Sequence, residues 1–128
     1  MRIIPPRKEA GRLGSTFTGS VFPLATMPPD DGVAINTINF APAARTFWHR
    51  HARGQVLLIL AGSGLIQSDG EAVRTIRAGD TVWVPPDERH WHGAGQESYI
   101  VHTAISLGQT TWETQVTDEE YTAPVGDR

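Results

Sequence analysis

Residues 45–55 read Arg-Thr-Phe-Trp-His-Arg-His-Ala-Arg-Gly-Gln, and residues 90–92 read His-Trp-His. Each segment carries two histidines separated by one residue. Alternate side chains of a β-strand point to the same face of a sheet, so each pair is expected to aim both imidazoles in one direction. Two such pairs on a rigid sheet predict a metal site.

The rest of the chain is typical of an all-β protein. Thirteen Gly and nine Pro separate short β-branched and aromatic runs, and no long stretch repeats apolar residues at helical spacing. Asp69-Gly70 predicts a hairpin turn, and Pro85-Pro86 predicts a corner that returns the chain to the sheet. Strands are expected at 16–22, 33–40, 45–51, 55–60, 64–68, 72–76, 81–84, 90–92, 99–105 and 111–116. Many short antiparallel strands predict a sandwich or barrel.

The length of 128 residues predicts one domain. We expect an N-terminal arm at 1–32, with an outer strand and then a loop over 23–32. A barrel is expected at 33–116 and a tail at 117–128, which begins with one helical turn capped by Thr117 or Asp118.

Composition narrows the class of partner. Eleven Lys and Arg against fourteen Asp and Glu give a net charge of -3, and no block of like charge stands out. Neither nucleic acid nor an anionic membrane is therefore expected to bind. The absence of Cys removes disulfides, thiolate nucleophiles and cysteine zinc sites. The N-terminus lacks the features of a signal peptide, and no apolar run could span a membrane, so a cytoplasmic protein is expected.

The candidate metal ligands are three imidazoles and one amide. His49, His51 and His90 offer nitrogen donors, and Gln55 can add an oxygen, a set that suits a divalent first-row metal. His92 lies one strand step beyond His90, which predicts a base beside the ion or a fifth ligand. The alternative for such histidines is a solvated strand end or a hydrogen-bonded core position.

A further histidine and several apolar residues are candidates for a substrate pocket. His102 shares a strand face with Ile100, Ala104 and Ser106, which predicts either a neutral pocket base or a core histidine. Substrate contacts are predicted for Asn36, Ile38, Phe40 and Phe47. Core or interface positions on the opposite faces are predicted for Trp48, Trp83 and Trp91.

Two segments carry a family resemblance. Residues 43–55, followed by Ala61-Gly62, resemble the first cupin motif, and residues 79–90 resemble the second. The resemblance covers residues 33–107 and implies a single-domain cupin, which is a double-stranded β-helix with a jelly-roll-like barrel and a metal inside one open end. It also implies a homodimer, often with exchanged terminal strands.

Three positions depart from the cupin pattern. Ala43 and Asp87 replace motif glycines, which affects turns, and Gln55 stands where most cupins have Glu. A neutral ligand leaves the ion with its full double charge, so it would be a better Lewis acid. The alternative is that Gln55 only makes a hydrogen bond at the start of its strand.

Gln55, together with residues 45–51, residues 90–94 and His102, resembles the bacterial manganese-dependent cupin hydroxynitrile lyases, and the resemblance extends to Trp112 and residues 116–121. It implies that the metal ligands are His49, His51, Gln55 and His90, with manganese as the first choice and iron, nickel or zinc as alternatives. It also implies proton transfer by His92 and His102.

The predicted function is that of a metal-dependent lyase that cleaves or forms the C–C bond of a cyanohydrin. A mononuclear iron dioxygenase is one alternative, because open positions on iron can bind dioxygen. A cupin that binds a small molecule without converting it is another, since a fold does not fix a function. In all three cases the expected partner is a small molecule.

Overall fold

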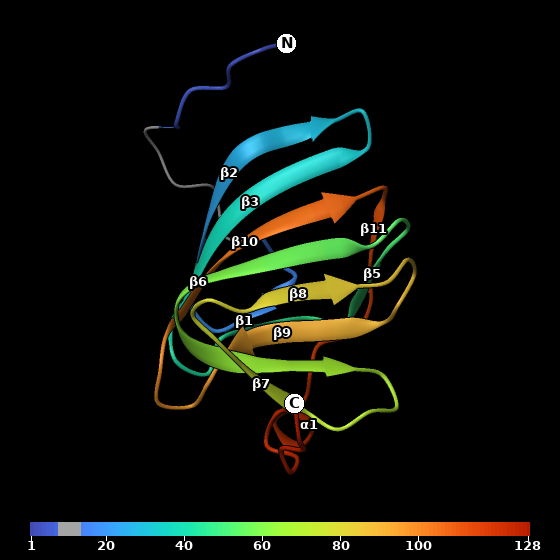
Figure 1. Ribbon diagram of the computed structural model, residues 1–128. Helices are drawn as coiled ribbons and strands as arrows, with labels where there is room; N and C mark the ends of the chain where they lie inside the picture. The colour runs from blue at the N-terminus through green and yellow to red at the C-terminus, as the bar shows by residue number, and fades with distance from the viewer. Residues whose placement is uncertain (8–13) are drawn as a thin grey trace.

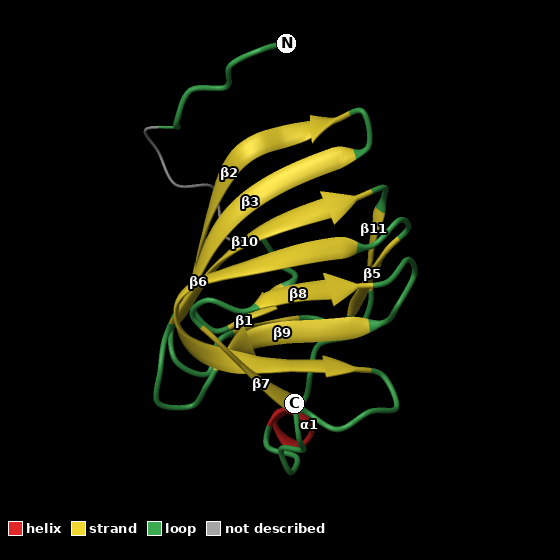
Figure 2. Cartoon of the chain, viewed as in Figure 1, coloured by secondary structure: helices red, strands yellow, loops and turns green. Residues whose placement is uncertain are grey.

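The computed structural model describes residues 1–7 and 14–128, and strands make up nearly all of the regular structure there (Figure 2). Its one short helix is α1 (Asp118–Tyr121). The strands are β1 (Phe17–Thr18), β2 (Val21–Asp30), β3 (Val33–Phe40), β4 (Arg45–Thr46), β5 (His49–His51), β6 (Gln55–Ser68), β7 (Arg74–Arg77), β8 (Thr81–Val84), β9 (His90–Ala94), β10 (Ile100–Leu107) and β11 (Thr110–Trp112). Within the described residues, no helix has the length and apolar character that a membrane-spanning helix requires.

The strands form a nearly closed barrel made of two sheets that share β6. The first sheet has the order β2-β3-β10-β6-β8, and Figure 1 shows these strands side by side from the top of the view downward. In the second sheet, the later half of β6 pairs with β7 and β9. β9 also pairs with β4 and with β5; β4 in turn pairs with β1, and β5 pairs with β11. The all-β cupin architecture predicted from the sequence is confirmed.

A sharp bend in β6 lets one strand serve both sheets. Gly62 has a φ of 73°, and a Cβ at this position would collide with the carbonyl of Tyr99. Only glycine adopts this conformation at such close range without strain. The predicted strands at 55–60 and 64–68 are therefore one continuous strand.

Two hydrophobic clusters stabilise the barrel. The larger cluster fills the space between the sheets and includes Phe40, Leu57 and Ile100, each with no exposed surface. The smaller cluster includes Trp48 and Trp91 together with Tyr121 of α1. The Tyr121 hydroxyl donates to the carbonyl of Ala94 at 2.7 Å, which ties the C-terminal turn to β9.

The prediction of a loop at 23–32 is wrong, because β2 runs through Val21–Asp30 and pairs antiparallel with β3. Its prolines suggested a loop because proline cannot donate a ladder hydrogen bond. However, β2 is an edge strand, and its register shifts between Ala25 and Met27 and again between Met27 and Asp30. An edge position and bulges are the two settings in which a strand tolerates proline.

The predicted strand at 45–51 is instead divided into β4 and β5. Phe47 donates its backbone N–H to Thr16, and Trp48 donates to Thr114, so both residues leave the sheet ladder. The predicted helical turn is present as α1, and Thr117 caps it through a capping box with Glu120.

Candidate metal centre and adjoining cavity

Three histidines meet inside the barrel. His49 and His51 lie on β5, and His90 lies opposite His49 in the register with β9. Each can offer a ring nitrogen within 4.8 Å of the others, and each is at most 3% exposed. The strand alternation places both histidines of β5 on the inner face, while Arg50 between them pairs with Glu113 on the outside.

Hydrogen bonds fix which ring nitrogen of each histidine faces the centre. The Nδ1–H of His49 donates to the carbonyl of Phe47 at 2.8 Å, and that of His90 donates to the carbonyl of Glu88 at 2.9 Å. A carbonyl only accepts, so each neutral ring keeps its lone pair on Nε2. His51 contacts the Thr110 hydroxyl through Nδ1 at 2.9 Å, and its buried Nε2 has no hydrogen-bond partner among the described residues.

Gln55 adds an oxygen to this set. Its amide N–H donates to the Ser106 hydroxyl at 3.1 Å, which directs Oε1 toward His90 Nε2, also at 3.1 Å. Both of these facing atoms then carry lone pairs and neither carries a hydrogen. Such an arrangement is stable when a cation lies between or beside them.

Burial keeps the imidazoles in the neutral form that binds metals. Desolvation is the largest cause in each case: it holds the pKa of His49 well below its ordinary value, lowers that of His90, and lowers that of His51 to about 4. Neighbouring imidazoles lower the pKa of His49 and His51 further. Three neutral nitrogens and one amide oxygen therefore fit a divalent first-row metal ion.

Two more histidines form a pair beside this cluster. The Nε2 of His102 lies 3.0 Å from the Nδ1 of His92, and both side chains are at most 1% exposed. Their strands, β9 and β10, are separated by β6, so the curvature of the barrel brings them together. The His92 Nε2 has no hydrogen-bond partner among the described residues.

A cavity of about 370 Å³ opens onto the histidine cluster. Its wall includes His92, whereas His102 is not among the described residues that line it. Trp112 covers one side, with its ring centroid 4.5 Å from that of His49. The other lining residues are Gly14, Phe17, Pro23, Pro29, Ala34, Asn36, Ile38, Thr46, His49, His51, Gln55, Ala104, Ser106 and Thr110. Half of the lining residues are apolar and the other half are polar, including the histidine cluster, and a concave cavity with convergent polar groups is typical of a small-molecule site.

The residues predicted to contact substrate lie in different places. Asn36 and Ile38 line the cavity. Phe40 lies behind it in the core, with ring centroids 5.1 Å from His102 and 6.0 Å from His92. Phe47 serves the site through its backbone carbonyl, which accepts from His49. Substrate contact itself stays a prediction for all four.

Ser106 and Thr110 were not predicted as site residues. Ser106 orients Gln55, and its shared strand parity with His102 was the available signal. Thr110 orients His51, but no feature of the sequence indicates that β11 pairs with β5.

We expect metal-free protein to lose stability as the pH falls from 7 to 5, in part through His102. Burial lowers the pKa of His102 to about 4, so the unfolded chain binds a proton more readily than the folded one. The stability contributed by neutral His102 is fully present above about pH 6.5 and declines toward pH 4. Urea unfolding in the presence of a chelator should show that, between pH 7 and pH 5, the free energy of unfolding falls by about 2 kcal/mol more for the parent than for His102→Gln. Equal losses would contradict the prediction.

The matched sequence family and relatives are consistent with this geometry. Residues 36–104 match the cupin domain family. The chain is 44% identical over 111 residues to an (R)-mandelonitrile lyase from Granulicella tundricola, and the match covers 82% of this chain and 85% of that protein. Among solved structures, a cupin-like protein from Thermotoga maritima has a TM-score of 0.83 at 37% identity, covering 88% of this chain and 92% of the other. The polyketide cyclase RemF from Streptomyces resistomycificus has a TM-score of 0.73 at 14% identity, covering 94% and 90%, and it shares the fold alone.

Proposed function

The chain belongs to the cupin domain family, and on this basis we propose that it is a metal-dependent lyase that cleaves or forms cyanohydrins. The observation that carries the proposal is a cluster of three imidazoles and one neutral amide beside a cavity whose wall also includes His92, which contacts a further buried histidine, His102. The relative that is 44% identical is named as an (R)-mandelonitrile lyase.

His49, His51 and His90 would hold a divalent ion through Nε2, and Gln55 through Oε1. We propose manganese, with iron, nickel and zinc as alternatives. When bound, the ion supplies positive charge that makes a nearby hydroxyl more acidic. All four protein ligands are neutral, so none of them offsets that charge.

We propose that His92 accepts the hydroxyl proton of a cyanohydrin, because His92 lines the cavity and its Nε2 has no hydrogen-bond partner among the described residues. As the O–H bond breaks, its electrons form the carbonyl double bond, and the C–C bond pair leaves with cyanide. The products are an aldehyde and cyanide, and the proton resides on His92. His102 positions His92 through the contact between the two rings. In the reverse direction, His92 returns the proton.

Purified manganese-loaded protein tests this function. We expect it to release cyanide from mandelonitrile faster than the His49→Ala, His51→Ala double variant, which lacks two of the proposed ligands and whose fold is checked by circular dichroism. Release no faster than that of the double variant would overturn the proposed reaction.

We expect Gln55→Glu to bind metal at least as tightly as the parent and to release cyanide about tenfold more slowly. The carboxylate would neutralise part of the positive charge that the amide leaves free. Metal content by elemental analysis, measured alongside cyanide release, separates the two effects. If the variant is as active as the parent, the charge of residue 55 does not matter to the reaction.

A further inference from the structure

The two strands that carry the three histidines of the cluster are joined at only one position. Among the described residues, β5 and β9 pair only where His49 lies opposite His90. The orientation of each ring depends on the backbone just before it, because each Nδ1–H donates to the carbonyl two residues earlier, at Phe47 and Glu88. A single register pair supplies few hydrogen bonds, so other contacts must fix how these two backbone segments lie relative to each other.

Arg89 lies directly before His90 and contacts Trp48, which lies directly before His49. The guanidinium carbon of Arg89 is 4.2 Å from the centroid of the Trp48 ring. Trp48 is 3% exposed, and the Arg89 side chain is 20% exposed. A cation over an indole face is attracted by the ring, and more strongly where water is excluded. The contact therefore links the two backbone segments that orient His49 and His90.

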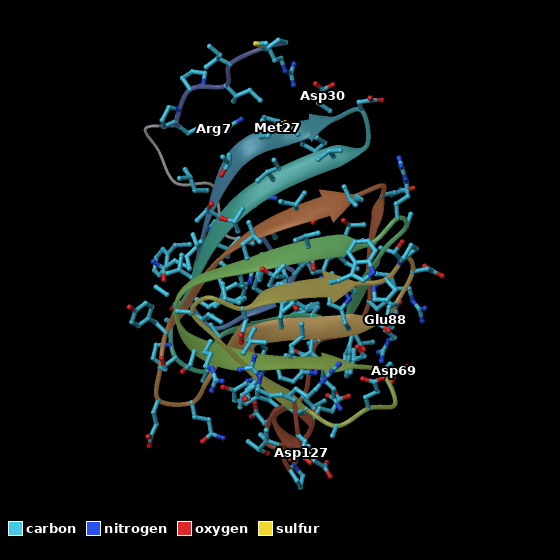
Figure 3. All side chains as sticks on the ribbon, in the orientation of Figure 1. Arg7, Met27, Asp30, Asp69, Glu88 and Asp127 are labelled. Atoms are coloured by element: carbon cyan, nitrogen blue, oxygen red, sulfur yellow. The ribbon has the colours of Figure 1, made fainter. Side chains whose placement is uncertain are left out.

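The same guanidinium is held by two further segments of the chain. Its Nε–H donates to Oε1 of Glu113 at 2.8 Å, and its Nη1 lies 3.5 Å from Oδ1 of Asp69. Glu113 directly follows Trp112, whose ring lies against that of His49. Asp69 comes directly after β6, and Figure 3 shows it close to Glu88 at the end of the barrel where β9 begins. One side chain thus connects several segments around the histidine cluster.

Arg50 belongs to the same network but makes fewer contacts. Its Nε–H donates to Oε2 of Glu113 at 2.7 Å. Hydrogen bonds from Arg50 and Arg89 hold the pKa of Glu113 below its ordinary value, so this carboxylate is charged at neutral pH. The Arg50 side chain is 36% exposed, and among the described residues it has no cation–π contact. Exposed ion pairs contribute little, so we expect the histidine cluster to depend on Arg89 and not on Arg50.

We propose that Arg89 is a positioning residue for the metal centre. It offers no ligand atom itself. Through Trp48 and through its own backbone it sets the relative placement of the segments before His49 and His90, and hence of the two rings. A metal site binds tightly when contacts outside the ligands hold the donors in place before the ion arrives. This inference rests on the metal centre of the proposed function and does not depend on the reaction catalysed there.

Titration calorimetry of the metal-free protein with Mn²⁺ tests this role. We expect Arg89→Gln to raise the dissociation constant by about tenfold, the lower end of the cost of losing an outer contact of a metal site. Arg89→Lys keeps the charge but not the planar fork that reaches Glu113 and Trp48 together, so its loss should be smaller, about threefold. Arg50→Gln is the matched control, because it makes the same change on the other side of the Glu113 carboxylate, and it should bind Mn²⁺ as the parent does.

The imidazole Nδ1–H protons of the metal-free protein give a second readout, which a purely structural role elsewhere in the barrel would not move. We expect the protons of His49 and His90 to exchange with water at least about tenfold faster in Arg89→Gln than in the parent, as measured by proton NMR, because the segments that hold them open more often. Circular dichroism verifies that each variant is folded. If Arg89→Gln does not fold, the affinity of Arg89→Lys is the deciding measurement.

An unchanged affinity in Arg89→Gln, beside a parent that binds Mn²⁺, would overturn the inference and leave the proposed function standing. An equal loss in Arg50→Gln would also overturn it, since the effect would then follow the exposed charges and not the contact with Trp48. A parent that binds no Mn²⁺ would overturn the proposed function instead. In that case unchanged exchange of the His49 and His90 protons in Arg89→Gln would overturn the positioning role as well, and faster exchange would support it.

Discussion

His49→Ala is expected to remove bound metal almost completely and to lower cyanide release by about a thousandfold. His49 is 1% exposed and lies between the two other imidazoles, with ring centroids 4.9 Å from His51 and 4.2 Å from His90. Its removal takes away one of the four proposed donors and leaves two imidazoles and one neutral amide, a set that we expect to bind the ion much more weakly. A loss of several kcal/mol of transition-state stabilisation corresponds to a factor of about a thousand.

Arg50→Ala is the matched control, because Arg50 lies on the same strand but points outward to Glu113. This variant should keep close to the parent's metal content and activity. Elemental analysis and cyanide release, measured on the same samples, check both expectations. Metal retained by His49→Ala at the parent's level would place the ion elsewhere in the protein.

The strand spacing of the histidines was the strongest signal in the sequence. Alternate side chains of a strand share a face, so His49 and His51 are expected on the same face. The structure puts both side chains inside the barrel. Arg50, which lies between them, points outward and pairs with Glu113, as the same alternation requires. Because the signal depends only on local backbone geometry, it required no knowledge of which strands pair.

Features that depend on which strands pair were not predictable in this way. Residues 23–30 belong to a strand because β2 pairs with β3 and its position at the sheet edge tolerates proline. Thr110 reaches His51 only because β11 pairs with β5. The 3.0 Å contact between His92 and His102 spans the intervening strand β6, so it reflects barrel curvature rather than sequence periodicity.

His92 and His102, which the sequence left equivalent, differ in their position relative to the cavity. Both are buried and both have lowered pKa values, chiefly because of desolvation. However, only His92 belongs to the wall of the described cavity, and His102 lies behind it. We therefore propose His92 as the group that meets the substrate and His102 as the residue that positions it.

His92→Ala is accordingly expected to lower the turnover of mandelonitrile by about 10²- to 10⁴-fold, the range typical of losing a general base, while bound metal stays near the parent's level. His102→Gln should cause a smaller loss, because the amide can still contact His92 Nδ1 and leave the base in place. The measurements are turnover under saturating substrate and metal content by elemental analysis. If His102→Gln lost more activity than His92→Ala at equal metal content, the two roles would be reversed. If the turnover of His92→Ala stayed within a few-fold of the parent's turnover, proton transfer would not pass through His92 and His102.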